Sequence, residues 1–139
     1  FDVVSAGILG FFAPFALGYS FVDDAMAIPF QAYYFTCCVM GFHAFSTIMD
    51  YDVDKRSGDR TFAVAYGKRA AALFPAAIFL CSLFIIRVNY TKGFFMACLV
   101  LFVLTAVIPS ERIARYSFLA MFLSAVAIVT IWIASSVLR

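Results

Sequence analysis

Long apolar stretches separated by short polar connectors dominate the chain. Each stretch approaches the roughly 20 residues that a helix needs to cross the hydrocarbon core of a bilayer. Strict alternation of apolar and polar residues, which barrel strands would need, is absent, and unpaired backbone groups are too costly in lipid for other structures. We therefore predict an all-α integral membrane protein with five transmembrane helices. They lie near residues 3–20, 27–49, 69–89, 93–109 and 115–138.

Four prolines refine these boundaries. Pro14 and Pro75 lie inside apolar stretches and predict local kinks, because proline lacks the N–H of a helical hydrogen bond. Pro29 suits the first turn of a helix, and Pro109 marks the end of one.

Composition supports the same class of protein. Hydrophobic residues make up 65% of the chain, charged residues make up only 13%, and the mean hydropathy is +1.01. A soluble domain would need far more polar side chains to cover its water-facing surface. Basic runs interleaved with aromatic residues are absent, so we expect no nucleic-acid partner. The four cysteines lack metal-ligand spacing and are expected to act as small buried hydrophobes. They are Cys37, Cys38, Cys81 and Cys98.

The distribution of basic residues predicts the orientation, because lysine and arginine are retained on the cytoplasmic side. The connectors after the second and fourth stretches share one side and are rich in them: Lys55, Arg56, Arg60, Lys68, Arg69, Arg112 and Arg115. The opposite side is poorer in basic residues and also carries two acidic ones: Arg87, Lys92, Arg139, Asp23 and Asp24. This asymmetry predicts a multi-pass protein of the cell membrane whose aspartate-rich connector is cytoplasmic.

That connector, "DYDVDKRSGDRT" at 50–61, is the most polar segment of the chain. A carboxylate at the bilayer centre costs about 2.5 to 3.5 kcal/mol, so the cluster must lie at a helix end. If the second helix continues through the segment, Asp50 and Asp54 share one face and Asp52 points nearly the other way. A polar stripe of His43, Ser46 and Thr47 would extend the first face toward the membrane.

Carboxylates one turn apart repel unless a cation lies between them, and hard oxygen ligands select Mg²⁺ or Ca²⁺. The spacing of Asp50, Asp52 and Asp54 fits the opening of an EF-hand loop, but Lys55 occupies the position that needs glycine and Thr61 the one that needs glutamate. Mg²⁺ instead takes one or two carboxylates, water and ligand phosphate oxygens.

The nearby basic residues Lys55, Arg56 and Arg60 would complete a site for a metal-bridged diphosphate. A simpler interpretation stays open. The charges would then form a solvated loop with local ion pairs, in which Gly58 ends a helix and the basic residues interact with its negative end.

The segment "HAFSTIMDYDVDKRSGDRTFAVAYG", residues 43–67, resembles the second aspartate-rich motif of the UbiA superfamily of intramembrane prenyltransferases. That motif reads D-x-x-x-D, a basic residue, a spacer with glycine, threonine or serine, and a stretch ending in glycine. The matching residues are Asp50, Asp54, Lys55, Gly58, Thr61 and Gly67. The "HAFS" lead-in further resembles the lycopene elongases of the carotenoid branch. On this resemblance, residues 1–139 correspond to the C-terminal portion of the domain, the last five of nine helices.

The resemblance implies an enzyme that transfers a prenyl group from a prenyl diphosphate to a lipophilic acceptor, with a carotenoid such as lycopene favoured over an aromatic acid. Asp50 and Asp54 would be catalytic Mg²⁺ ligands, and Lys55 and Arg60 would contact the diphosphate. Further candidates are Arg56 and Asp59 at the diphosphate, and His43, Ser46 and Thr47 as pocket-lining residues. His43 could equally be held by a neighbouring helix. Phenylalanines such as Phe42, Phe45, Phe94 and Phe95 would shield a cation or, as aromatic residues more often do, simply pack or face lipid.

The chain departs from the family in one respect: these residues contain no first aspartate-rich motif of the type N-D-x-x-D-x-x-x-D. Asp23 and Asp24 lie on the wrong predicted side to replace it. We therefore expect half of a metal site, inactive alone and completed by an N-terminal half or another membrane subunit. The alternative is a non-catalytic structural or lipid-binding subunit of a membrane complex. A transporter fragment has little support, because the helix around His43 has no glycine or proline break up to Met49.

Overall fold

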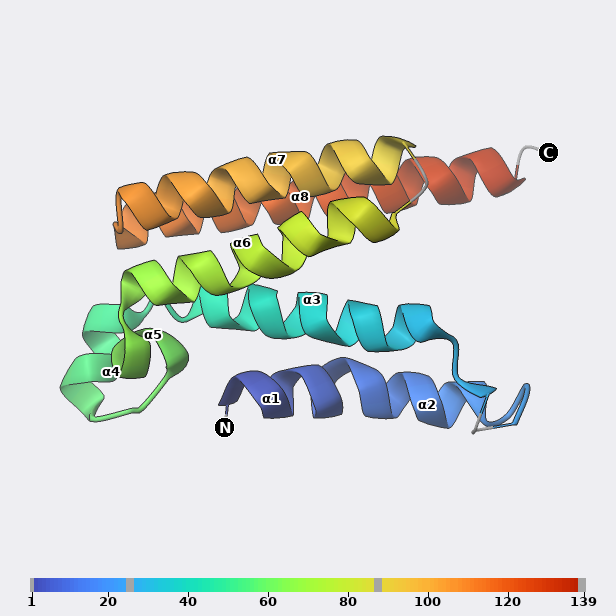
Figure 1. Ribbon diagram of the computed structural model, residues 1–139, viewed down its shortest axis with the longest axis horizontal. Coiled ribbons are helices and arrows are strands. Elements are labelled where there is room, and N and C mark those ends of the chain that lie inside the picture. Colours follow the sequence, from blue (N-terminus) through green and yellow to red (C-terminus); the bar gives the residue numbers. More distant parts are fainter. Residues whose placement is uncertain (1, 25–26, 87–88, 138–139) are drawn as a thin grey trace.

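The computed structural model describes residues 2–24, 27–86 and 89–137, and this part of the chain is helical without any strand (Figure 1). The prediction of an all-α chain is confirmed for these residues. The elements are α1 (Asp2–Gly7), the π-helical turn η1 (Ile8–Phe12), α2 (Ala13–Tyr19), α3 (Phe30–Ser46), α4 (Tyr51–Ser57), α5 (Phe62–Tyr66), α6 (Lys68–Ile85), α7 (Asn89–Val107) and α8 (Glu111–Val137).

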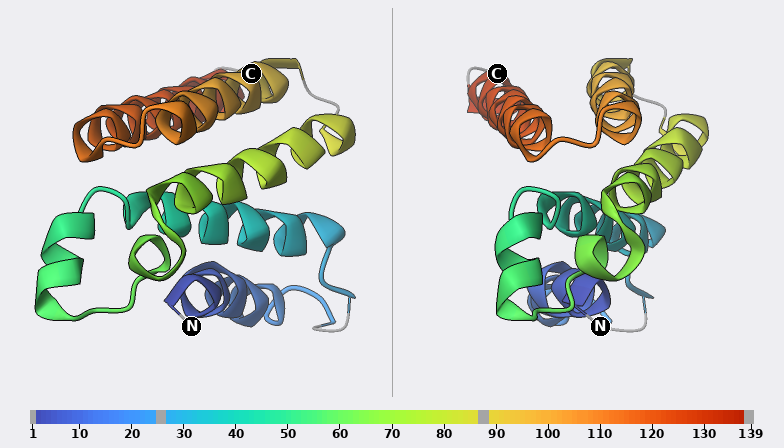
Figure 2. Two further views of the ribbon diagram at one scale, coloured as in Figure 1. Left: turned by 60° about the vertical axis from the view of Figure 1, so that its left-hand side comes forward. Right: turned by 90° about the vertical axis from the view of Figure 1, so that its left-hand side faces the viewer.

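The long helices follow one another across the molecule (Figures 1 and 2). The rod formed by α1, η1 and α2 packs on α3, α3 packs on α6, and α6 packs on α7, while α8 contacts both α7 and α3. The short helices α4 and α5 lie together at one end, beside the first residues of α1, α6 and α8. This end therefore gathers the aspartate-rich segment and much of the basic charge.

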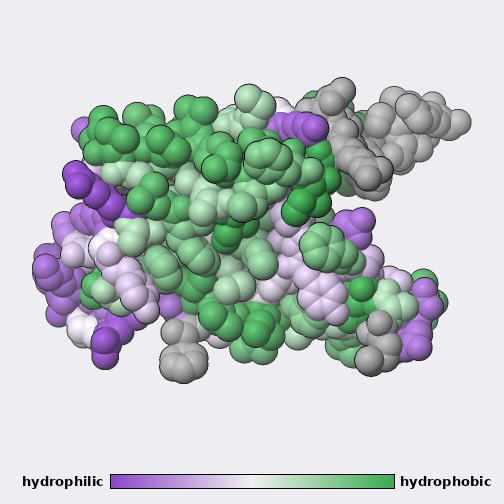
Figure 3. Space-filling view, viewed as in Figure 1, coloured by the Kyte–Doolittle hydropathy of each residue, from purple (hydrophilic) through white to green (hydrophobic). Residues whose placement is uncertain are grey.

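Three helical segments are long and apolar enough to cross a membrane: Asp2–Tyr19, Lys68–Ile85 and Glu111–Ile131. A shorter apolar segment, Thr91–Val107, lies within α7, and α3 has only 17 residues. Hydrophobic surface covers the middle of the molecule, and hydrophilic surface gathers toward its two ends (Figure 3). The helices are thus compatible with a membrane location, with three candidate spans where the sequence predicts five.

The prolines lie at irregular or closely packed positions. Pro14 lies at the start of α2, directly after the π-helical turn in which the Ala13 N–H bonds to the Ile8 carbonyl. Such a turn shifts the hydrogen-bond ladder where proline has no N–H to offer. Pro29 is the N-terminal cap of α3, just before its first turn. Pro75 is buried inside α6, where it faces Gly41: a Cβ atom at Gly41 would lie 3.1 Å from the Pro75 Cβ.

Aromatic rings form the core between α3, α6 and α7. Phe45, Phe79 and Phe102 are fully buried, with ring centroids 4.9 Å apart for Phe45 and Phe102 and 5.1 Å apart for Phe79 and Phe102. Phe95 stacks on Phe79 at 4.5 Å, and Phe42 meets the same ring edge-on at 5.2 Å. Phe42, Phe45 and Phe95 therefore serve packing, the commoner of the two roles considered from the sequence.

The prediction that one continuous helix runs from α3 into the aspartate-rich segment is wrong. α3 ends at Ser46, residues 47–50 form turns, and α4 begins at Tyr51 and runs across the end of α3 (Figure 2). At this break the Ile48 N–H bonds to the Phe45 carbonyl at 3.1 Å instead of continuing the α-helical ladder to Ala44. The Thr47 hydroxyl donates to the Ala44 carbonyl at 2.7 Å, so a side chain replaces the missing backbone donor.

Candidate functional site

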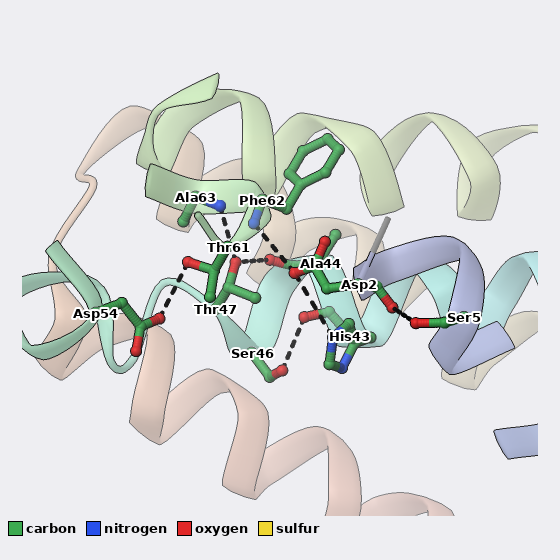
Figure 4. Close-up of polar contacts among 10 residues, drawn as sticks. All are labelled: Asp2, Ser5, His43, Ala44, Ser46, Thr47, Asp54, Thr61, Phe62 and Ala63. Atoms are coloured by element: carbon green, nitrogen blue, oxygen red, sulfur yellow. Dashed lines mark hydrogen bonds and ion pairs between the residues drawn. The ribbon is translucent and has the colours of Figure 1, made fainter. Parts of the chain in front are cut away.

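Asp50 lies immediately before α4, and Asp54 lies at the end of the first turn of α4. Asp50 is the N-terminal cap, and its carbonyl accepts the Asp54 N–H at 2.8 Å, so the two residues remain one helical turn apart despite the break in α3. The Asp50 side chain is exposed and makes no hydrogen bond or ion pair within the described ranges. The Asp54 carboxylate is half-buried, and its Oδ2 accepts a hydrogen bond from Thr61 Oγ1 at 3.0 Å (Figure 4).

Two glycines shape the segment around Asp54. Gly58 ends α4 with φ 84°, and Gly67 separates α5 from α6 with φ 90°. No other residue of the described chain has a positive φ. A side chain in the left-handed region costs roughly 1–2 kcal/mol, so these positions favour glycine. The Asp59 N–H then bonds to the Asp54 carbonyl at 2.9 Å, which turns the chain back so that Thr61 reaches Asp54.

The start of α5 is capped by side chains that are distant in sequence. The Phe62 N–H donates to Asp2 Oδ2 at 3.2 Å, and the Ala63 N–H donates to Thr47 Oγ1 at 3.0 Å (Figure 4). Thr47 is only 7% exposed. Its hydroxyl accepts from the Ala63 N–H at the start of α5 and also donates to the Ala44 carbonyl near the end of α3. The hydroxyl therefore links these two helices.

His43 lies in the last turn of α3 and faces the first residue of α1. Its Nε2 is 3.8 Å from Asp2 Oδ2, with both side chains partly exposed (Figure 4). Its backbone carbonyl accepts the Ser46 hydroxyl at 2.7 Å, a bond within the same helix. Asp2 thus joins His43 to α5, a role that sequence reasoning missed because no motif includes this residue.

A cavity of about 780 Å³ opens beside this cluster between α1, α3, α5 and α6. Its lining is mainly apolar and comprises Asp2, Val3, Val4, Met40, Arg60, Phe62, Ala65, Tyr66 and Phe74. Of the candidate site residues, Arg60 is part of this lining. His43, Ser46 and Thr47 are not, and for them the pocket-lining role stays a prediction.

A second polar cluster fixes the other face of α4. Lys68 Nζ lies 3.0 Å from Glu111 Oε1, 3.7 Å from Asp52 Oδ1 and 4.4 Å from the centroid of the Tyr51 ring. The same Glu111 oxygen accepts the Asp52 N–H at 3.1 Å. Asp52 and Asp54 therefore engage different neighbours, and the starts of α6 and α8 are tied to the first turn of α4. Lys68 and Glu111 are separated by 43 positions, so no local pattern predicts this cluster.

The predicted diphosphate-binding residues are all exposed. Lys55 Nζ lies 5.8 Å from the centroid of the Tyr51 ring, and Arg56 Nε donates to the Asp52 carbonyl at 3.0 Å. Arg60 is on the opposite side of Gly58 in the chain and faces the cavity. Asp59 accepts the Ser57 hydroxyl at 2.7 Å, which engages it locally. The structure thus brings Lys55 and Arg56 together on α4, with Arg60 beside α5.

The carboxylate oxygens of Asp50 and Asp54 are donors of the kind that Mg²⁺ binds. Within the described ranges, no three His, Cys, Asp or Glu side chains are grouped closely enough to hold a metal. Asp50 offers an unengaged carboxylate, and Asp54 keeps one oxygen outside its bond to Thr61. Two carboxylates suffice where water and phosphate oxygens complete the octahedron, as Mg²⁺ prefers.

No protein-family model, curated protein or solved structure matches the chain. The resemblance to the UbiA superfamily therefore depends on the motif at 43–67 alone and stays a prediction.

Proposed function

We propose that this chain supplies the second aspartate-rich half-site of a UbiA-type prenyltransferase. The reaction is Mg²⁺-dependent transfer of a prenyl group from a prenyl diphosphate to a lipophilic acceptor, and a carotenoid such as lycopene is favoured over an aromatic acid. The observation that carries the proposal is the arrangement of Asp50 and Asp54. They lie one turn apart at the polar end of an apolar helix bundle, with Asp54 fixed by Thr61 and Asp50 left open.

Each motif residue has a role in this chemistry. Asp50 and Asp54 would hold Mg²⁺, which when bound offsets the charge of the leaving diphosphate. Lys55 and Arg60 would bind diphosphate oxygens by charge-assisted hydrogen bonds, with Arg56 in support. Thr61 acts through Asp54 by fixing one of its oxygens. Gly58 and Gly67 provide the backbone turns on which this placement depends.

The bond changes balance without a further reactant. The allylic C–O bond of the prenyl diphosphate breaks, and the bonding electrons leave with the diphosphate. The resulting allylic cation forms a new bond with an electron-rich carbon of the acceptor, which then loses a proton. Lys55 and Arg60 contribute by stabilising the charge that develops on the diphosphate oxygens. The apolar helices beside the site suit a lipophilic acceptor.

The test uses the full-length protein in membranes with Mg²⁺, dimethylallyl diphosphate and either lycopene or an aromatic acid. Asp50→Asn and Asp54→Asn should each lower product formation at least about a hundredfold, on the order of 3 kcal/mol in the barrier. Asp23→Asn removes a carboxylate at the opposite end of the bundle and should leave the rate unchanged. Equal rates in all three variants would remove the assigned roles of Asp50 and Asp54.

A second candidate function is a non-catalytic, UbiA-like structural or lipid-binding subunit of a membrane complex. Its support is the missing first aspartate-rich motif, since these residues contain no N-D-x-x-D sequence. In that case the Asp50→Asn and Asp54→Asn variants would assemble with their partner subunits as well as the unmodified chain does. Co-purification of the complex from membranes measures this directly. An N-D-x-x-D-bearing helical segment in the full-length protein would favour the enzyme instead.

A further inference from the structure

One face of α8 is basic in its first turns and apolar beyond them. α8 lies at an edge of the bundle (Figure 2). Among its exposed residues, one series follows the helical repeat of three to four positions and so lies on one side of the helix. Tyr116 is 64% exposed, Leu119 51% and Leu123 57%. The face comprises Arg112, Arg115, Tyr116, Leu119, Leu123 and Val126.

The positive charge of this face is not neutralised within the described chain. Neither Arg112 nor Arg115 forms an ion pair there, and Arg115 makes only a long contact of 3.5 Å with the Met49 carbonyl. Glu111 borders the same face, but its Oε1 already accepts from Lys68 Nζ at 3.0 Å and from the Asp52 N–H at 3.1 Å. Two guanidinium groups are therefore left available for an anion.

These residues also enclose a shallow hollow. It measures about 340 Å³ and is lined by Glu111, Arg112, Arg115 and Tyr116. The hollow lies where α8 begins its apolar run, the depth at which arginine and tyrosine side chains meet lipid headgroups. Leu119 and Leu123 continue from Tyr116 along the same side of the helix. The ligand that fits has an anionic head and an apolar tail.

We propose that this face of α8 binds an acidic phospholipid. Arg112 and Arg115 hold the phosphate, because guanidinium groups pair with phosphate oxygens through two hydrogen bonds each. Tyr116 lies beside the headgroup, and the acyl chains follow Leu119, Leu123 and Val126. Basic clusters at the membrane surface attract acidic lipids in the same way. The proposal shares no residue with the prenyl-transfer site, so either can fail without the other.

The experiment measures binding of phosphatidylglycerol and of phosphatidylcholine to the purified full-length protein in detergent, by native mass spectrometry. The unmodified chain should prefer phosphatidylglycerol. Each of Arg112→Gln and Arg115→Gln should reduce that preference about fivefold, and the double variant about twenty-five-fold, as one surface charge contributes about a factor of five. Arg112→Lys with Arg115→Lys keeps the charge and should retain most of the preference.

The matched control for the single variants is Arg69→Gln, which removes one exposed charge from the same end of the molecule and should keep the preference. The absence of any preference in the unmodified chain, or an equal loss in this control, overturns the proposal. So does displacement of the lipid by soluble glycerol phosphate at the same concentration, because the apolar stripe would then contribute nothing. The protein could instead form a dimer that the Leu123→Trp substitution dissociates and that phosphatidylglycerol leaves unchanged. That result would identify the face as an interface between copies.

Discussion

The Thr47 hydroxyl joins the end of α3 to the start of α5, and replacing it with valine removes that link while preserving the shape of the side chain. Thr47→Val deprives two groups of their partner: the Ala63 N–H, 3.0 Å from Oγ1, and the Ala44 carbonyl, 2.7 Å from it. Both residues are 0% exposed, so water cannot replace the hydroxyl without a rearrangement. A buried group left without a partner costs about 1–3 kcal/mol. We therefore expect Thr47→Val to lower the free energy of unfolding by about 2 kcal/mol or more.

Thr47→Ser is the matched control, because it keeps the hydroxyl and removes one methyl group, at about 0.8 kcal/mol. A second control is Thr130→Val on α8, where an exposed hydroxyl bonds only within its own helix, at 2.8 Å to the Val126 carbonyl. It should change stability by less than about 0.5 kcal/mol. The assay is reversible unfolding in mixed micelles, followed by circular dichroism. If the valine and serine variants of Thr47 are equally stable, the hydroxyl does not cap α5 and the account of the break after α3 is wrong.

Three further substitutions test the packing around the site. Gly58→Ala should lower the free energy of unfolding by about 1–2 kcal/mol, because φ is 84° at this position. The control is Gly93→Ala, at an open position of a helix, which should be neutral or stabilising in the same unfolding assay. Gly41→Ala should cost about 1–3 kcal/mol, since its Cβ would lie 3.2 Å from the Pro75 Cα, and a smaller loss would show that α3 and α6 can separate freely. Glu111→Gln weakens the anchor of α4, so amide hydrogen exchange in the first turn of α4 should become faster; unchanged exchange would contradict an anchoring role.

Apolar length predicted most of the helical architecture. The stretches at 69–89 and 115–138 correspond closely to α6 and α8, and the stretch at 3–20 corresponds to α1, η1 and α2 together. The stretch at 27–49 is longer than the helix within it, because α3 has 17 residues. Apolar residues continue to Met49 on both sides of the polar Ser46 and Thr47, so hydropathy gives no sign that the helix ends at Ser46.

The geometry of the candidate site depends on contacts that local sequence does not encode. The break after Ser46 is stabilised by the Ala63 N–H, 16 positions from Thr47, and the start of α5 by Asp2, 60 positions from Phe62. The glycines at 58 and 67 were visible as positions of the predicted motif, and their positive φ angles explain why glycine suits both positions. The one-turn spacing of Asp50 and Asp54 was predicted from a helix continuing out of α3, whereas in the structure it comes from α4 and its N-terminal cap, Asp50.

The dependence of α5 on two distant caps has a consequence for the order of assembly. A helix of five residues has no stability of its own, because its nucleation cost exceeds what so few hydrogen bonds return. Asp2 and Thr47 both precede α5 in the chain, so during synthesis their helices are already made when Phe62 and Ala63 emerge. The segment that closes over Asp54 should thus take its final form only after α1 and α3 have met.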